Sequence, residues 1–294
     1  MRIFLTGASG MLAAEVVPEL ERQNHEVLAY SLNPRLSHIQ KLDITDKDSV
    51  CNEIKKTRPD FVFHLAAETN VDRCQREPEH AFRVNTSGTE NVALACRECD
   101  IPMLYISTSA VFYGDKKTPY TELDIPNPKN IYGQSKWQGE TAVRNLLSRY
   151  LIVRPGWMVG GWDIDKKFVY KIVSQIKEGK TELRAVSDKY GSPTFTKDFA
   201  RNLTAIIGSQ RYGVYHLTNT GACSRYEIAV KVVEFMGLGH KVKVLPVDSS
   251  VFPMEAPRPD SEMMQNYQLD LLGLNRMPPW EQSLEEYVKT NKDK

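Results

Sequence analysis

The stretch Thr6-Gly-Ala-Ser-Gly-Met-Leu-Ala13 joins a short apolar run, Ile3–Thr6, to a segment with apolar residues at helical intervals. A glycine-rich turn between a strand and a helix lets the backbone approach a pyrophosphate closely, and the helix start adds amide donors and a partial positive charge. A strand-to-helix turn without a ligand is the structural alternative. We expect a dinucleotide to be held here by Gly7, Ser9, Gly10, Met11 and Leu12.

Short apolar or β-branched runs alternate with helical patterns through the first half of the chain. The expected strands are Ile3–Thr6, Glu26–Tyr30, Phe61–Leu65, Met103–Ser107 and Leu151–Arg154, and the expected helices lie near residues 11–23, 47–56, 78–98 and 131–149. Short strands separated by helices are typical of a parallel sheet covered on both faces. The predicted fold class is α/β, with a doubly wound, Rossmann-like parallel sheet whose ligands bind at the carboxyl ends of the strands.

The regular alternation weakens after Arg154-Pro155, where glycines and prolines become frequent and further helices are expected near residues 166–178, 197–208 and 224–236. We predict a dinucleotide-binding domain over residues 1–155 and a smaller, mainly substrate-binding lobe over residues 156–294. This lobe is expected to be partly discontinuous, because segments such as Gly213–Leu217 have the composition of a strand that returns to the Rossmann sheet.

The charges of the chain are balanced. There are 38 Lys and Arg against 37 Asp and Glu, for a net charge of +1, and no segment concentrates one sign. The sequence therefore lacks the concentrated positive charge that is typical of nucleic-acid-binding proteins. No apolar run approaches the roughly 20 residues of a membrane span, and the N-terminus lacks the pattern of a signal peptide. We expect a cytoplasmic protein that binds neither nucleic acid nor a membrane.

The five cysteines, Cys51, Cys74, Cys96, Cys99 and Cys223, are scattered over the chain, which suits free thiols in a reducing compartment. Cys96 and Cys99 form a lone C-x-x-C, whereas a structural zinc site requires four ligands. The six histidines are dispersed as well. We therefore predict no metal site.

Tyr132 and Lys136 are four residues apart in Ile131-Tyr-Gly-Gln-Ser-Lys136. On a helix this spacing puts both side chains on one face, with roughly 5–6 Å between their Cβ atoms. An adjacent ammonium stabilises a phenolate and should bring the pKa of the phenol closer to neutrality, which makes acid catalysis feasible. The alternative is an ordinary amphipathic helix with a solvated Lys and a half-buried Tyr. The same spacing at Tyr113 and Lys117 lies in a stretch with Gly114, Asp115 and Pro119 that predicts a loop.

The residues after the second expected strand bear on the choice of dinucleotide. Nicotinamide cofactors without a 2′-phosphate are usually marked by an acidic residue about 20 positions after the glycine-rich turn. Here the segment reads Ala29-Tyr-Ser-Leu-Asn-Pro-Arg35 and contains no acid. Ser31 and Arg35 could hold a 2′-phosphate, so we expect NADPH, with NADH as the alternative; an exposed loop arginine is the other explanation for Arg35.

Together these features resemble the extended short-chain dehydrogenase/reductase superfamily, whose motifs include the glycine-rich turn, a strand that ends in Ser or Thr, and Tyr-x-x-x-Lys. Leu42-Asp-Ile-Thr-Asp46 resembles its adenine-contacting segment, His64-Leu-Ala-Ala67 its strand exit near the cofactor riboses, and Val84-Asn85 its helix asparagine. The resemblance narrows to the dTDP-4-dehydrorhamnose reductases through Arg154-Pro-Gly-Trp157, Tyr190-Gly-Ser-Pro-Thr194, Gly213-Val-Tyr-His-Leu217 and Ala256-Pro-Arg-Pro259.

The resemblance implies roles for individual residues. Tyr132 would protonate the nascent alkoxide, Lys136 would tune Tyr132 and hold the nicotinamide ribose, and Thr108 would bind the keto oxygen. The cofactor set is extended by Asp43, Ile44, Leu65, Ala66 and Ala67, and the substrate set is Ser109, Trp157 and Arg258. An aromatic side chain with one polar group suits a hexose face, so Trp157 is expected to pack on the sugar, although a core position is the alternative.

The chain differs from the dTDP-4-dehydrorhamnose reductases after its Ser-Thr pair. It also lacks two features that are found in other members of the superfamily. The reductases typically continue their Ser-Thr pair with Asp-Tyr, whereas this chain has Ser109-Ala110, as in sugar-nucleotide epimerases. One substrate contact is therefore missing or replaced. The Asp-Glu pair of sugar 4,6-dehydratases is absent after Thr108, which argues against dehydration. Glu15 matches a glutamate of a metal-bridged dimer in some relatives, but the other ligands have no counterparts.

Three functions follow from the resemblance. The first is an oxidoreductase, an NADPH-dependent 4-ketoreductase of a deoxysugar nucleotide such as dTDP-4-dehydrorhamnose, in a rhamnose-type biosynthetic pathway. The second is a sugar-nucleotide 4-epimerase with bound NAD, which consumes no cofactor. The third is a non-catalytic regulatory subunit resembling the beta subunit of methionine adenosyltransferase. The sequence leaves open the hexose, the nucleotide, the stereochemistry at C4 and the number of subunits, with a homodimer as one option.

Overall fold

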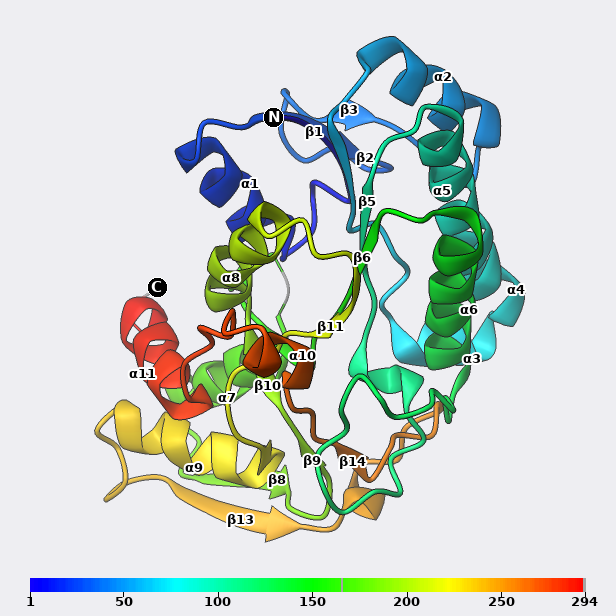
Figure 1. Cartoon of the computed structure of the whole chain (residues 1–294). Coiled ribbons are helices and arrows are strands. Elements are labelled where there is room, and N and C mark those ends of the chain that lie inside the picture. Colours follow the sequence, from blue (N-terminus) through cyan, green and yellow to red (C-terminus); the bar gives the residue numbers. More distant parts are fainter. Residues whose placement is uncertain (165, 293–294) are drawn as a thin grey trace.

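Strand β1 (Arg2–Thr6) lies inside a parallel sheet in the computed structural model, which describes residues 1–164 and 166–292. Over these residues the sheet has seven strands in the order β11-β6-β5-β4-β1-β2-β3 (Figure 1). The other six are β2 (Glu26–Ser31), β3 (Gln40–Lys41), β4 (Phe61–His64), β5 (Met103–Ile106), β6 (Tyr150–Arg154) and β11 (Gly213–His216). The order reverses at β1, between β2 and β4, and ligands bind at such a switch point. The predicted fold class is confirmed.

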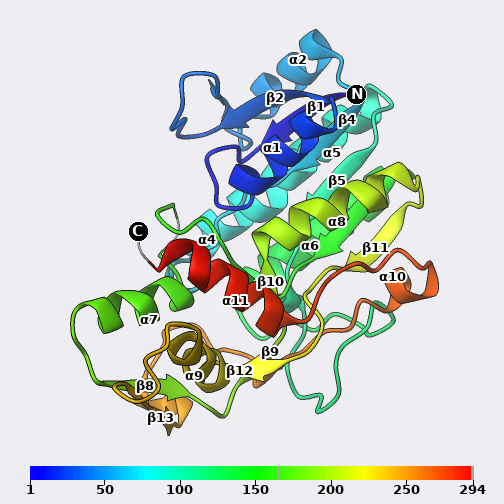
Figure 2. The ribbon, with the colours of Figure 1, turned by 90° about the vertical axis from the view of Figure 1, so that its left-hand side faces the viewer.

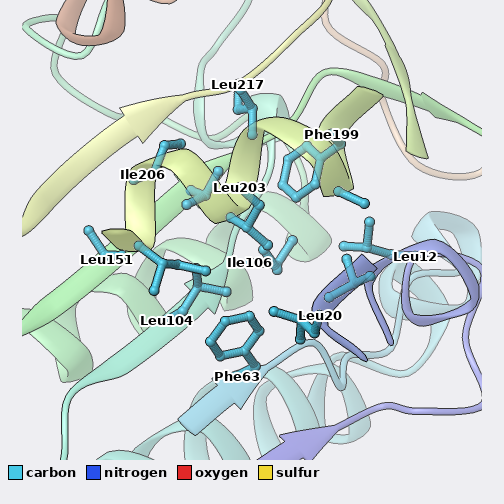
Figure 3. Close-up of a cluster of buried hydrophobic side chains, with 14 of the residues drawn as sticks. Leu12, Leu20, Phe63, Leu104, Ile106, Leu151, Phe199, Leu203, Ile206 and Leu217 are labelled. Carbon is cyan, nitrogen blue, oxygen red and sulfur yellow. The ribbon is translucent and has the colours of Figure 1, made fainter. Parts of the chain in front are cut away.

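Helices cover both faces of this sheet (Figures 1 and 2). One face carries α2 (Lys47–Thr57), α5 (Gly88–Glu98) and α6 (Ile131–Leu146), and the other carries α1 (Ala13–Arg22) and α8 (Thr196–Gly208). Figure 3 shows side chains of α1 and α8 meeting those of β4, β5 and β6 on the second face, among them Leu20, Phe63, Leu104 and Leu203. Because both faces are covered, the central strands are mostly apolar, and their polar residues Thr6, His64 and Arg154 stand at the carboxyl ends of β1, β4 and β6.

Two expected helices differ from those observed at their ends. Helix α1 starts at Ala13, because Met11 and Leu12 remain in the turn that follows β1. Helix α6 ends at Leu146, because Leu147 adopts an extended conformation that leads into β6. At both places the residues that connect the helix to the sheet are not helical.

The helix expected over residues 78–98 contains a π-helical turn. The segment consists of α4 (Pro78–Phe82), the π-helical turn η1 (Arg83–Ser87) and α5. Such turns insert one residue into an α-helix and occur frequently at functional sites. Here the turn contains Asn85, whose side chain is fully buried.

The buried face of α6 is not the one that its apolar residues suggested. Trp137, Ala142, Leu146 and Leu147 are spaced at helical intervals, which predicts an apolar stripe, but Trp137 is 37% exposed. The face that packs against the sheet instead carries Gly133, Ser135, Lys136, Gly139, Glu140 and Val143. This helix therefore buries polar side chains, which require partners inside the protein.

The remaining elements form a second layer below the carboxyl ends of the strands (Figures 1 and 2). They are β7 (Trp157–Val159), α7 (Phe168–Lys177), β8 (Glu182–Val186), β9 (Tyr190–Gly191), β10 (Pro193–Phe195), β12 (Cys223–Ser224), α9 (Arg225–Phe235), β13 (Lys243–Val247), η3 (Ser249–Val251), β14 (Ser261–Glu262), α10 (Tyr267–Leu271) and α11 (Trp280–Asn291). Two short elements, α3 (Val71–Arg76) and η2 (Ser109–Val111), follow β4 and β5. The division at residue 155 stays a prediction, and residues 293–294 lie outside the described part.

The second layer packs around its own core, but it does not include every element after residue 155. It has its own apolar core, to which Trp162, Ile172, Val232 and Leu284 belong. Helix α8 and strand β11 lie in the sequence range of the lobe but pack on and in the Rossmann sheet.

Within the described residues, no helix combines the length and apolarity that crossing a membrane would demand.

Candidate active site

A cavity of about 1190 Å³ opens at the carboxyl ends of the strands and extends to the second layer. It is lined by every residue that the sequence assigned to cofactor or substrate, from Gly7 and Ser9 at the glycine-rich turn to Trp157 and Arg258. These residues come from positions up to 251 apart along the chain, and the fold brings all of them to one cavity. Its size and its location at the switch point suit two ligands bound end to end.

The glycine-rich turn is held by tight contact with β4. Gly7 has a φ of +77°, and a Cβ at this position would lie 2.6 Å from the backbone nitrogen of Ala66. Any side chain here would clash with the exit of β4 before it reached a phosphate. Glycine is therefore needed to seat the turn against the sheet, which differs from the simpler expectation that it only makes room for a ligand.

One end of the cavity lies beside β2, where Tyr30, Ser31 and Leu32 line it. The backbone nitrogen of Arg35 donates to Ser9 Oγ at 3.2 Å, which ties the loop after β2 to the glycine-rich turn. Ser31 and Arg35 both line the cavity. Asp43 Oδ1 accepts from the backbone and hydroxyl of Thr45 at 2.9 and 2.8 Å, and this turn fixes the wall at Asp43 and Ile44.

Tyr132 and Lys136 are presented by the first turns of α6. Asn130 caps the helix, because its Oδ1 accepts from the nitrogen of Gly133 at 2.9 Å, and its Nδ2 donates to the carbonyl of Pro257 at 3.0 Å. Gly133 is required by close packing: a Cβ there would lie 2.1 Å from the carbonyl oxygen of Ala110. The start of α6 is thereby pressed against the turn that follows Thr108.

The phenol of Tyr132 lies at the cavity near Thr108. Burial raises its pKa to about 12, the nearby Thr108 hydroxyl opposes this rise, and the charges of Cys74, Glu262 and Glu68 add to it. This direction is opposite to the expectation that a neighbouring ammonium moves the pKa of the phenol toward neutrality. With this raised pKa the phenol is protonated at pH 7, as an unperturbed phenol also is, and it is the weaker acid of the two.

Thr108 ends the exit of β5 and caps η2. Its Oγ1 accepts from the nitrogen of Ala110 at 3.1 Å. Its hydroxyl also lies within hydrogen-bonding reach of the Tyr132 phenol, so these two side chains adjoin each other at the cavity.

Lys136 is 2% exposed, and its ammonium lies 4.1 Å from the centroid of the Tyr105 ring. Burial lowers its pKa to about 7, while the carboxylate of Glu140 and the thiol of Cys74 oppose this effect. The ammonium form is stabilised by the ring face of Tyr105 and by Glu140. Near pH 7 the side chain therefore has access to both protonation states.

Asn85 joins α6 to the loop that follows β4. Its Oδ1 accepts from the nitrogen of Glu68 at 2.9 Å, and its Nδ2 donates to the carbonyl of Glu68 and to Ser135 Oγ, both at 3.0 Å. The π-helical turn places this amide between the two segments. Its side chain thus orients the helix that carries Tyr132 and Lys136 relative to the wall at Ala66 and Ala67.

Glu140, on the same helix as Lys136, forms a buried ion pair with Arg154 of β6. Glu140 Oε1 accepts from Arg154 Nε at 2.8 Å and from Ser107 Oγ at 2.6 Å, and its Oε2 accepts from Arg154 Nη2 at 2.6 Å. Both partners are about 1% exposed. The sequence did not single out Glu140, because an i, i+4 carboxylate on a helix usually faces solvent.

The residues predicted to bind substrate lie where both layers line the cavity. Trp157 donates from Nε1 to Glu262 Oε2 at 2.7 Å, and the guanidinium of Arg225 lies 3.9 Å from the centroid of the indole. One face of the ring is therefore occupied by Arg225, a partner that the sequence did not indicate. Arg258 pairs with Asp72 at 2.9 Å on the wall of the cavity.

Glu262 and Arg225 line the cavity but were not predicted. Glu262 lies in a two-residue strand, and Arg225 begins a helix whose cap is formed by Ser224 and Glu227. Neither belongs to a motif with a mechanism attached, so only the fold connects them to Trp157. The single signal in the sequence was indirect: Ser109 stands where a different substrate contact was expected.

Comparisons with known proteins give matches over almost the whole chain. The family model described as "RmlD substrate binding domain" matches residues 1–292. The chain is 33% identical to the spore coat polysaccharide biosynthesis protein SpsK of Bacillus subtilis (strain 168), over 98% of this chain and 97% of that protein. It is 34% identical to the dTDP-4-dehydrorhamnose reductase of Mycolicibacterium smegmatis, over 98% of this chain and 85% of that one.

Among solved structures, the chain resembles the dTDP-4-dehydrorhamnose reductase of Bacillus anthracis in complex with NADP. The TM-score is 0.89 and the identity 36%, and the match covers 99% of each chain. Agreement at this level extends over the glycine-rich turn, the sheet and the second layer together.

Proposed function

Because this chain belongs to the dTDP-4-dehydrorhamnose reductase family, we propose that it is an NAD(P)-dependent oxidoreductase that reduces the 4-keto group of a dTDP-deoxysugar with NADPH. The observation that carries this proposal is that Thr108, Tyr132 and Lys136 line the same cavity as the glycine-rich turn. On this proposal, Tyr132 would be the proton donor and Thr108 the carbonyl-binding hydroxyl, both at the end of a dinucleotide groove.

NADPH fits the residues at the groove. The backbone of the glycine-rich turn is free of side chains at Gly7 and Gly10 and precedes the N-terminus of α1, where amide groups favour a pyrophosphate. Ser31 and Arg35 stand beside the expected position of a 2′-phosphate, with no acidic residue in that loop. When bound, the cofactor supplies the hydride for the keto carbon.

The protein residues would supply the proton and would orient the keto group and the ribose. Thr108 would donate its hydroxyl hydrogen to the keto oxygen and so polarise the carbonyl. Tyr132, whose raised pKa keeps it protonated at pH 7, would give its proton to the alkoxide oxygen as it forms. Lys136, buried beside the Tyr105 ring, would bind ribose hydroxyls and supply positive charge as Tyr132 becomes a phenolate.

The nucleotide part of the substrate would be held by basic residues of the second layer. The guanidinium of Arg225 stacks between Trp157 and Phe168, at 3.9 and 5.1 Å, and forms no hydrogen bond or ion pair with another residue of the described part. Lys171 and Lys189 also line the cavity, and Lys189 forms an ion pair with Asp260. A diphosphate would compensate these charges.

Two further expectations belong to this proposal. All five cysteines carry free thiols, which supports a cytoplasmic location. The homodimer remains an expectation to be checked by the mass of the protein in solution.

The proposal is tested by turnover. The purified protein is mixed with NADPH and dTDP-4-dehydrorhamnose, and the loss of NADPH absorbance is compared with the amount of 4-hydroxy sugar formed. A reductase oxidises one NADPH for each sugar reduced. Interconversion of C4 epimers without net loss of NADPH would favour the epimerase instead, and absence of both reactions would favour a binding subunit.

A further inference from the structure

Glu262 connects the reacting end of the cavity to the second layer. It lies in β14, which pairs with β9, and its side chain reaches the cavity. Its Oε1 accepts from Ser109 Oγ and its Oε2 accepts from Trp157 Nε1, both at 2.7 Å. Ser109 directly follows Thr108, so this carboxylate adjoins the residue expected to bind the keto oxygen.

The carboxylate of Glu262 keeps free capacity for a ligand. Each carboxylate oxygen can accept about two hydrogen bonds, and each oxygen of Glu262 accepts one from a neutral donor of the protein. In the described part of the chain no Lys, Arg or His forms an ion pair with it within 4.0 Å. A partly satisfied carboxylate on a cavity wall favours a further donor, such as a sugar hydroxyl.

Arg225 and Trp157 fix the position of this carboxylate. The indole is held at Nε1 by Glu262 and on one face by the guanidinium of Arg225, whose positive charge also interacts with Glu262. Gly191, the strand partner of Glu262, passes so close that a Cβ there would lie 2.4 Å from Cε2 of Trp157. The acceptor is therefore preorganised and does not depend on a flexible side chain.

Ser109 stands where the resembling reductases carry a carboxylate. The resembling reductases typically carry Asp after the Ser-Thr pair, whereas this chain has Ser109, and the carboxylate of Glu262 lies 2.7 Å from the hydroxyl of that serine. Glu262, 153 positions away from Ser109 in the sequence, therefore supplies a carboxylate to this part of the cavity in place of the missing Asp. Its direction of approach differs, so it would meet a different edge of the sugar.

We propose that Glu262 is a specificity-determining residue, whose carboxylate accepts a hydrogen bond from the hydroxyl at C3, beside the keto carbon of the sugar. The inference rests on the proposed reduction of a 4-keto sugar nucleotide. A site built to bind a substrate hydroxyl discriminates strongly against the analogue that lacks it, because the polar group of the site is then left without its partner.

The test compares two substrates and two variants. The substrates are a dTDP-4-keto-6-deoxyhexose and its 3-deoxy analogue, and the variants are Glu262→Gln and the control Glu234→Gln, which removes an exposed carboxylate paired with Lys231 on α9. The wild type and the control should prefer the hydroxylated sugar in kcat/KM by about 100-fold or more. Glu262→Gln should reduce this preference at least tenfold, mainly by slower use of the hydroxylated sugar. An unchanged preference would overturn the inference.

A binding experiment separates this inference from the proposed function. Calorimetric titration of the protein with NADP⁺ present, using dTDP-rhamnose and its 3-deoxy analogue, should show the same preference and the same loss in Glu262→Gln. If the wild type turned over neither keto sugar, the proposed function would fail, while equal binding of the two products would overturn the role of Glu262. Should Glu262→Gln not fold, Glu262→Asp, which retains the charge but withdraws it by one methylene, is expected to lose the preference in the same assays.

Discussion

Glu140 accepts two hydrogen bonds from the guanidinium of Arg154, at 2.8 and 2.6 Å, one helical turn after Lys136 on α6. The pair is shielded from solvent on both sides. Glu140→Gln would leave the guanidinium buried without its counter-charge. We expect it to lower the free energy of unfolding by about 3–5 kcal/mol, measured by urea unfolding.

A second variant separates the ion pair from general damage to the core. In Glu140→Gln combined with Arg154→Met, both charges are gone, so much of the lost stability should return. If the double variant were as unstable as the sum of the two single variants, the two side chains would not act as a coupled pair.

Lys136 makes stability depend on pH. Its pKa is about 7 in the folded protein and near 10.5 when unfolded. Between these values the unfolded chain binds a proton that the folded protein does not, so this residue makes stability rise with pH. Lys136→Met removes the effect. Without cofactor it should be more stable than the wild type below pH 7, and the difference should shrink toward pH 10.5 by about 1.4 kcal/mol per pH unit.

Urea unfolding at several pH values checks this expectation, with Lys289→Met as the control, because Lys289 is exposed and pairs with Glu285. A constant difference between Lys136→Met and the wild type across this range would mean that Lys136 keeps an ordinary pKa in the folded protein.

Tyr132→Phe removes only the proposed proton donor. We expect turnover to fall by on the order of 10²–10⁴, with the Kd of NADPH nearly unchanged. The matched control is Tyr113→Phe, which alters the other Tyr-x-x-x-Lys pair, in an exposed loop. Retention of wild-type turnover in Tyr132→Phe would remove this phenol from its proposed role.

Arg35 tests the choice of cofactor. Arg35→Ala should weaken NADPH binding by about tenfold and leave NADH binding unchanged, since a guanidinium–phosphate contact is charge-assisted and NADH lacks the 2′-phosphate. Fluorescence titration of both dinucleotides measures this, with Arg97→Ala on α5 as the control. Equal loss of affinity for both would place the contact of Arg35 elsewhere on the dinucleotide.

Six of the seven strands described in the sheet could be predicted from the sequence, because they are short and largely apolar, whereas β3, a pair of exposed polar residues, could not. The π-helical turn at Arg83–Ser87 could not, since its extra residue is stabilised by contacts of Asn85 with Glu68 and Ser135, both remote in sequence. The buried face of α6 was misread for a related reason. Periodicity identifies apolar faces, and this helix buries Lys136 and Glu140 while Trp137 is partly exposed.

The candidate site was predictable where a residue belongs to a local motif, as Gly7 and Tyr132 do. Glu262 and Arg225 could not be found in this way, because each acquires its setting only when β14 and α9 reach Trp157. The pKa of Tyr132 is also a property of the fold. Burial, which the sequence does not reveal for a single residue, raises it, although the four-residue spacing to Lys136 suggested the opposite.

The central claim is that this cavity transfers hydride from NADPH to the keto carbon of a sugar nucleotide. The most direct measurement uses NADPH carrying deuterium at C4 of the nicotinamide, prepared in each of its two stereochemical forms, with dTDP-4-dehydrorhamnose and mass spectrometry of the product. We predict that one form, and not the other, delivers a single deuterium to C4 of the sugar. A 4-hydroxy product without deuterium from either form would contradict the account.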